Sequence, residues 1–194
     1  MHQPHSSHWT VVKGILRYLK GIITHGLLFQ SGPLHLEAYS DANYAGCPID
    51  RRSTSGYCVY LGFCPISCSA KKQATMSRSN TKAEYWQLAL TIAELSWLCL
   101  LLKELNIFLP QPPLIWCDYI SFISLCSNPI YHARLKHLEV DYHFVREKVV
   151  HKELCVRYLN TVEQIADVFT KGLTSARFRL LRDKLMVHDC PMSL

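Results

Sequence analysis

The sequence lacks the cysteine spacing that metal-binding and disulfide-rich domains use. No C-x-x-C pair occurs, and the nine cysteines are an odd number. Many of them lie inside apolar runs, which is typical of reduced core thiols in an intracellular protein. We therefore expect no disulfide partner. A zinc module built from Cys58, Cys64, Cys68 and nearby histidines is an alternative, but these spacings do not match the usual ligand pairs.

The sequence also has no long apolar run and no leader pattern. Its most apolar stretch, residues 89–102, contains Glu94 and is shorter than the roughly 20 residues that a membrane helix needs. The first residues, Met1–His5, lead directly into an amphipathic pattern instead of a signal peptide. We expect no membrane partner and an intracellular location, cytoplasmic or nuclear.

What is present is the composition of a basic globular protein. Hydrophobic residues make up 49% of the 194 residues, enough for one domain with or without an appendage. The formal net charge is +6, and a basic surface attracts polyanions, of which nucleic acid is the commonest. The basic residues form three clusters: Arg51-Arg52; Lys71, Lys72, Arg78 and Lys82; and Arg177, Arg179, Arg182 and Lys184.

Hydrophobic periodicity predicts an α/β fold. Three closely spaced strands favour an antiparallel meander, and a later strand followed by a helix favours parallel pairing. The expected elements, in order, are a basic amphipathic helix at about 6–23, strands at 34–39, 56–61 and 65–70, a helix at 80–105, a strand at 114–117, helices at 120–127 and 135–149, a strand at 154–159, a helix that carries Asp167, and a basic helix at 176–187.

Two aspartates follow predicted strands. Asp41 is predicted to lie where a strand gives way to a turn, and Asp118 to lie at the carboxyl end of strand 114–117. In open α/β sheets, ligands bind at such strand ends. Asp41 also has an ordinary explanation, because aspartate favours turns by bonding its own backbone.

Two further acids lie in predicted helices. Glu84 heads a helix face that continues with Leu88 and Leu95, which is unusual because burying an unpaired carboxylate is costly. Alternatively, its charge caps the first helical turn, since Thr81 and Glu84 have capping-box spacing. Asp167 shares its face with polar residues, which by itself is an ordinary solvated side.

The four acids thus come from four different elements. Several carboxylates that converge can hold two divalent cations, and such a pair can hold the attacking water and the leaving oxygen of a phosphodiester. Oxygen ligands favour magnesium or manganese.

Short motifs along the chain carry a family resemblance. From about residue 34 to 187 the sequence resembles the ribonuclease H domain of copia-type retrotransposon Pol polyproteins. Residues 1–33 resemble the end of the reverse transcriptase connection segment, and residues 188–194 would form a C-terminal tail. The motifs are Tyr39–Gly46, Arg51–Tyr57, Ser69–Gln73, Ala83–Tyr85, Cys117-Asp118, His132–Arg134, Lys136–Glu139 and Ala166–Lys171, preceded by His8-Trp9 and Leu16–Gly21.

The resemblance implies a fold, an activity and a set of partners. The fold is a mixed five-stranded sheet, three antiparallel strands and then parallel ones, flanked by helices. The activity is endonucleolytic hydrolysis of the RNA strand of RNA–DNA hybrids by a two-metal mechanism during reverse transcription. The implied partners are the hybrid and the reverse transcriptase domain of a longer polyprotein.

The resemblance also implies the site residues. Two Mg²⁺ ions, or Mn²⁺, would be held by four catalytic carboxylates, with Glu84 pointing into the site. The implied carboxylates are Asp41, Glu84, Asp118 and Asp167, and the residues we expect on the hybrid's phosphates are Lys71, Lys72, Arg78 and Lys82.

The sequence departs from the family pattern at a few positions. Tyr119 stands where Asn is usual, Cys68 where Trp is common, and Asn43-Tyr44 replaces Asp-Trp. No departure removes a carboxylate, but Tyr119 adds bulk beside Asp118. The polymerase motif Tyr-x-Asp-Asp is also missing. An alternative is therefore a decayed or repurposed fragment that binds nucleic acid without catalysis.

Overall fold

The computed structural model describes residues 3, 5–119 and 139–190. The helix predicted at 120–127 and the His132–Arg134 motif lie outside the described residues. The helices are α1 (Ser6–Gly21), α2 (Asn80–Glu104), α4 (Glu139–Val150), the 3₁₀ turn η2 (Thr161–Glu163), α5 (Asp167–Thr170) and α6 (Ser175–Lys184). The strands are β1 (His25–Leu27), β2 (Leu36–Asn43), β3 (Thr54–Leu61), β4 (Cys64–Lys72), β5 (Leu114–Cys117), β6 (Cys155–Tyr158) and β7 (Val187–Asp189).

Five of these strands form one mixed sheet in the order β4-β3-β2-β5-β6. The pairs β2–β3 and β3–β4 are antiparallel, and the pairs β2–β5 and β5–β6 are parallel. The predicted sheet of three antiparallel strands followed by parallel ones is confirmed. Because β2 lies at the centre, it is the strand on which both halves of the sheet depend.

The central strand β2 extends further than the sequence predicted. Asp41 was expected at the junction of strand and turn, but the ladder to β3 continues to the pair Asn43–Thr54, so Asp41 lies within the strand and opposite Gly56. On its other side, β2 pairs with β5 only as far as Tyr39. The last residues of β2 therefore have a backbone partner on one side only, and this leaves room beside Asp41.

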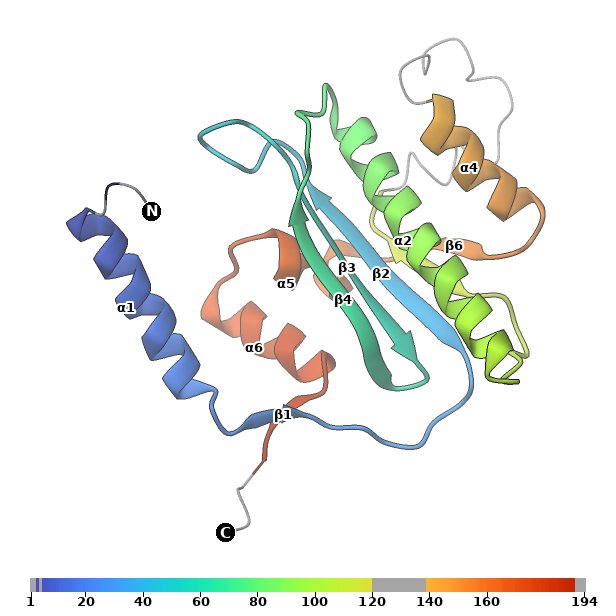
Figure 1. Ribbon diagram of the computed structural model, residues 1–194, viewed down its shortest axis with the longest axis horizontal. Coiled ribbons are helices and arrows are strands. Elements are labelled where there is room, and N and C mark those ends of the chain that lie inside the picture. The colour runs from blue at the N-terminus through green and yellow to red at the C-terminus, as the bar shows by residue number, and fades with distance from the viewer. Residues whose placement is uncertain (1–2, 4, 120–138, 191–194) are drawn as a thin grey trace.

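Helices cover both faces of the sheet (Figure 1). The long helix α2 packs on one face with α4 beside it, while α5 and α6 lie on the other. The larger apolar core lies between α2, α4 and the sheet and includes Leu36, Ile92 and Ile115. A smaller cluster around Cys58, Tyr60 and Ile165 lies on the opposite face. The two cores hold the sheet between two helical layers.

Helix α2 is a core helix. Its length and apolar composition would by themselves suit a membrane span. However, the face that packs against the sheet and α4 is buried, and this burial explains the composition. Its buried residues are Ala83, Tyr85, Gln87, Leu88, Ala89, Thr91, Ile92, Leu95, Leu98 and Leu102.

The two ends of the chain meet in a small second sheet. Strand β1 pairs antiparallel with β7, with Leu27 opposite Val187. The last helix was predicted to reach Val187, but α6 ends at Lys184, because the chain turns through a positive φ of 57° at Met186 to enter β7. Helix α1 precedes β1 and stands away from the main sheet (Figure 1). The division at residues 33 and 187 stays a prediction.

Gly56 allows α5 to approach the sheet closely. A Cβ atom added there would lie 2.7 Å from Phe169 Cβ and 2.7 Å from Thr170 Cγ2, closer than carbon atoms pack. Because Gly56 pairs with Asp41 in the ladder, the contact also fixes where α5 lies relative to that carboxylate. A residue without a side chain is therefore required at this point of β3.

We expect Gly56→Ala to lower the free energy of unfolding by about 1–3 kcal/mol, because α5 would have to shift away from β3. The measurement is urea unfolding followed by circular dichroism. Gly172→Ala is the matched control, since no described heavy atom lies within 4 Å of its added Cβ, and it should stay within about 0.5 kcal/mol of wild type. Equal stability of the two variants would contradict the close approach.

Candidate active site

Three acids from different elements meet at the open end of β2. Carboxylate oxygens of Asp41 on β2, Glu84 on α2 and Asp118 just after β5 all lie within 4.8 Å of one another. They line a cleft of about 380 Å³, together with Asn80 and Tyr119 among others. Three oxygen donors at this separation form a ligand set for a hard divalent cation.

The start of α2 leaves Glu84 free to point at the sheet. Ser79 is the N-cap, and its side chain accepts a hydrogen bond from the Lys82 N–H. The capping box predicted from Thr81 and Glu84 is therefore wrong, because Ser79 already satisfies the helix end. The carboxylate of Glu84 instead faces the end of β2, where the backbone N–H of Ala42 acts to lower its pKa. Of the two interpretations of Glu84, the structure supports the acid that heads the buried face.

The pKa values of two of these acids are raised. Burial raises the pKa of Asp41, although the neighbouring Lys171 ammonium and the Thr170 hydroxyl act in the opposite direction. Burial also raises the pKa of Glu84 well above its ordinary range, and the negative charges of Asp41 and Asp118 add to the effect. The cluster therefore holds its negative charge at a free-energy cost, which a bound cation would relieve.

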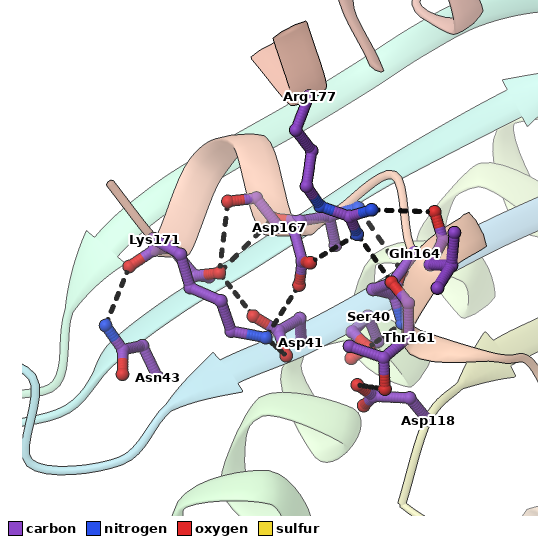
Figure 2. Close-up of polar contacts among 12 residues, drawn as sticks. Ser40, Asp41, Asn43, Asp118, Thr161, Gln164, Asp167, Lys171 and Arg177 are labelled. Carbon is purple, nitrogen blue, oxygen red and sulfur yellow. Dashed lines mark hydrogen bonds and ion pairs between the residues drawn. The ribbon is translucent and has the colours of Figure 1, made fainter. Parts of the chain in front are cut away.

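The fourth predicted acid, Asp167, does not join the three. It begins α5 and is 2% exposed, so the solvated side expected from its helical neighbours is wrong. Its oxygens accept from two cations: Lys171 Nζ at 2.6 Å and Arg177 Nη2 at 2.8 Å. Lys171 Nζ also lies 3.1 Å from Asp41 Oδ1 and so connects the two aspartates (Figure 2).

Lys171 is held charged between these carboxylates. Burial disfavours its ammonium, but Asp41 and Asp167 outweigh this effect and raise the Lys171 pKa above its ordinary range. The Thr170 hydroxyl donates to the other oxygen of Asp41. Both oxygens of Asp41 are therefore engaged by residues of the α5 segment.

Side-chain hydrogen bonds hold α5 and the turn before it against the end of β2. Asn43 Nδ2 donates to the Thr170 carbonyl at 3.1 Å, and Gln164 Nε2 donates to the Ser40 carbonyl at 3.1 Å (Figure 2). Thr161 and Gln164 have the spacing of a capping box, but no α-helix starts at Thr161. Only a 3₁₀ turn forms, because Gln164 uses its side chain to bind β2. Asp167 therefore begins a separate short helix, α5, and does not lie within a helix that starts at Thr161.

Two hydrogen bonds fix the far wall of the cleft. Thr161 Oγ1 donates to Asp118 Oδ2 at 3.0 Å, which orients that carboxylate. The hydroxyl groups of Tyr119 and Thr81 lie 2.7 Å apart, so Tyr119 connects the end of β5 to the start of α2. The unusual tyrosine thus forms part of the cleft wall and contacts the core through its ring.

The predicted phosphate contacts lie at the end of β4 (Lys71 and Lys72), just before α2 (Arg78) and in the first turn of α2 (Lys82). Lys71, Lys72 and Arg78 are exposed, and Lys82 is half-buried. Lys72 Nζ lies 2.8 Å from Asp50, so part of its charge is already neutralised. None of the four lines the cleft itself, but Arg78 and Lys82 are each two residues from Asn80, which does.

Sequence reasoning assigned no role to Lys171 and Arg177. The i,i+4 spacing of Asp167 and Lys171 is a local signal that could have identified the first pair. Arg177 shows no such signal, because it reaches Asp167 from the separate helix α6. Thr170, which binds Asp41 from 129 residues away, was equally hidden.

Comparison with known proteins identifies the fold. No protein-family model matches the chain. The N-terminal RNase H domain of Rv2228c from Mycobacterium tuberculosis superimposes with a TM-score of 0.51 at 13% identity, covering 77% of this chain and 97% of that one. LC11-RNase H1, solved in complex with an RNA/DNA hybrid, gives a TM-score of 0.51 at 12% identity, covering 70% and 93%. The chain therefore has the ribonuclease H fold.

Sequence similarity identifies the family. The chain is 46% identical over 194 residues to the retrovirus-related Pol polyprotein from transposon RE2 of Arabidopsis thaliana. The match covers 100% of this chain and 13% of that polyprotein. The chain is therefore a homologue of one part of the retrovirus-related Pol polyproteins of copia-type transposons, and it has the ribonuclease H fold. That residues 1–33 are the end of the reverse transcriptase connection segment stays a prediction.

The raised pKa of Glu84 predicts a pH-dependent stability when divalent ions are removed. The folded carboxyl group holds its proton more tightly than the unfolded one, so stability falls as the pH rises from the ordinary glutamate pKa towards the raised value. We expect Glu84→Gln to remove this loss and to raise the Tm at about pH 7, by about 2–4 °C for each kcal/mol recovered.

Thermal unfolding in EDTA between about pH 4 and pH 8 measures this effect. Glu104→Gln, at the exposed end of the same helix, is the control and should follow the wild-type curve. If Glu84→Gln is no more stable than wild type at neutral pH, ionised Glu84 does not destabilise the folded protein.

Proposed function

We propose that this chain is a divalent-metal-dependent endonuclease that hydrolyses the RNA strand of RNA–DNA hybrids during retrotransposon reverse transcription. The observation that carries the proposal is the convergence of Asp41, Glu84 and Asp118 at the open end of the central strand. The chain's place in a Pol polyprotein and its ribonuclease H fold support it.

The residues of the cleft fit a magnesium or manganese ion. Three carboxylates lie within ligand-sharing distance, no soft thiolate lines the described cleft, and oxygen ligands are the choice of these ions. Asp41, Glu84 and Asp118 would hold the ion. When bound, such an ion supplies positive charge that orients the attacking water and stabilises the leaving oxygen of the phosphodiester.

The other side chains preorganise this ligand set. The Thr161 hydroxyl orients Asp118, and Thr170 with Lys171 holds Asp41. Ligands that are fixed before the substrate arrives need no reorganisation during the reaction.

The exposed basic residues at the end of β4 and just before α2 supply the contacts to the hybrid. Lys71 and Arg78 are free to reach phosphates beside the cleft, and such contacts add affinity without reading sequence. The 2′-hydroxyl groups distinguish the RNA strand from the DNA strand. A ribonuclease H1 of this fold has been solved with an RNA/DNA hybrid, which supports the hybrid as the substrate. The reverse transcriptase region of the longer polyprotein is the proposed partner.

Asp41→Asn is expected to reduce cleavage of a labelled RNA–DNA hybrid in magnesium by more than about 100-fold, since changes outside the ligand set alone cost about 10- to 100-fold. Asp183→Asn, whose carboxylate lies on the exposed side of α6, is the control and should cleave at the wild-type rate. A wild-type chain that leaves the hybrid intact with every divalent metal, yet still shifts it in a gel, would instead select binding without catalysis.

These basic residues make a second prediction, on the salt dependence of binding. Lys71→Ala is expected to weaken binding to hybrids of any sequence and to lower the slope of log K against log salt by about 1. Fluorescence anisotropy over a series of salt concentrations measures both quantities. Lys103→Ala, at the opposite end of α2, should leave the slope unchanged. Equal slopes for the two variants would place the hybrid elsewhere on the surface.

A further inference from the structure

The Lys171 ammonium lies where Asp41 and Asp167 would share a cation. Its Nζ atom is 3.1 Å from Asp41 Oδ1 and 2.6 Å from Asp167 Oδ1 (Figure 2). A divalent ion bridging the same two oxygens would need the space that this nitrogen fills. The two groups therefore compete for one position.

Arg177 makes Asp167 still less available as a ligand. Its Nη2 donates to Asp167 Oδ2 at 2.8 Å, and its guanidinium also donates to the carbonyls of Thr161 and Val162. With Lys171 on Oδ1, both oxygens of Asp167 are engaged by fixed positive charges. A metal ion would have to displace at least one of them.

The balance of charge at the site leads to the same result. Asp41, Glu84, Asp118 and Asp167 carry four negative charges when ionised, and Lys171 and Arg177 carry two positive ones. Two negative charges remain, which one divalent cation neutralises. In the free protein, a second divalent ion would leave the site with an excess of two positive charges and would be repelled by the nearby ammonium.

We propose that this chain binds a single divalent ion in the Asp41–Glu84–Asp118 cluster, and that Lys171 takes the place of a second ion between Asp41 and Asp167. The proposal rests on the proposed nuclease function and corrects one part of it, because the family resemblance implied two ions held by four carboxylates. Lys171 is then a positioning residue that fixes Asp41 and Asp167, and the short helix α5 holds it in place.

The number of bound Mn²⁺ ions tests the proposal without relying on activity. Electron paramagnetic resonance during a Mn²⁺ titration counts the ions, both for the free protein and for protein mixed with an RNA–DNA hybrid and frozen before turnover. We expect about one ion per wild-type chain, and about two in Lys171→Met, with the spectrum of two coupled ions. Lys171→Gln, which keeps an N–H donor but loses the charge, should also bind about two.

Two further variants serve as controls. Lys171→Arg keeps the positive charge and should stay at one ion, and Lys103→Met, far from the cleft, should match wild type. Two ions in the wild-type chain, or one ion in folded Lys171→Met and Lys171→Gln, would overturn the proposal. Hybrid cleavage, measured on unfrozen aliquots of the same protein preparations, separates the two claims. One ion without cleavage refutes the nuclease, and cleavage with two ions in the wild-type chain refutes the role of Lys171.

Discussion

Mutual repulsion of carboxylates is the constraint that organises this domain. Asp41 and Asp167 are almost fully buried, and Glu84 and Asp118 face Asp41 across a narrow cleft. Buried carboxylates this close together can stay ionised only if cations lie beside them. The chain supplies two of these cations itself, Lys171 at the end of α5 and Arg177 on α6, and the cleft beside Asp41, which Lys171 also lines, has room for a metal ion.

The architecture of the sheet makes that arrangement possible. Strand β2 continues beyond the end of its pairing with β5, so the side of Asp41 that faces Asp118 is not closed by a ladder. On the neighbouring strand β3, Gly56 lets α5 approach so closely that Thr170 and Lys171 contact the Asp41 carboxylate. Helix α2 and the end of β5 thus bring Glu84 and Asp118 to Asp41, while α5 and α6 bring the neutralising charges.

Much of the fold followed from local patterns. The unbroken run without glycine or proline at 80–105 predicted α2, and alternation predicted the strands, because periodicity reflects which face is buried. The errors were at element ends. The N-cap of α2 is Ser79, not Thr81. Strand β2 continues past Asp41 to Asn43. Val187, predicted to be helical, lies in β7 and pairs with Leu27. In each case a partner distant in sequence decided where the element ended.

The sequence by itself determined the order of strands and helices and the presence of four acids on four elements, because hydrophobic spacing and residue type are local properties. The tertiary structure alone decided how those acids are divided. Asp41, Glu84 and Asp118 face one another. Asp167 instead forms ion pairs with Lys171 and Arg177. Asp41 and Lys171 are 130 residues apart, and their contact depends on a helix packing against a glycine in a neighbouring strand. No local sequence pattern predicts a contact between residues so far apart in the chain, so the charge balance of the site could be determined only from the folded structure.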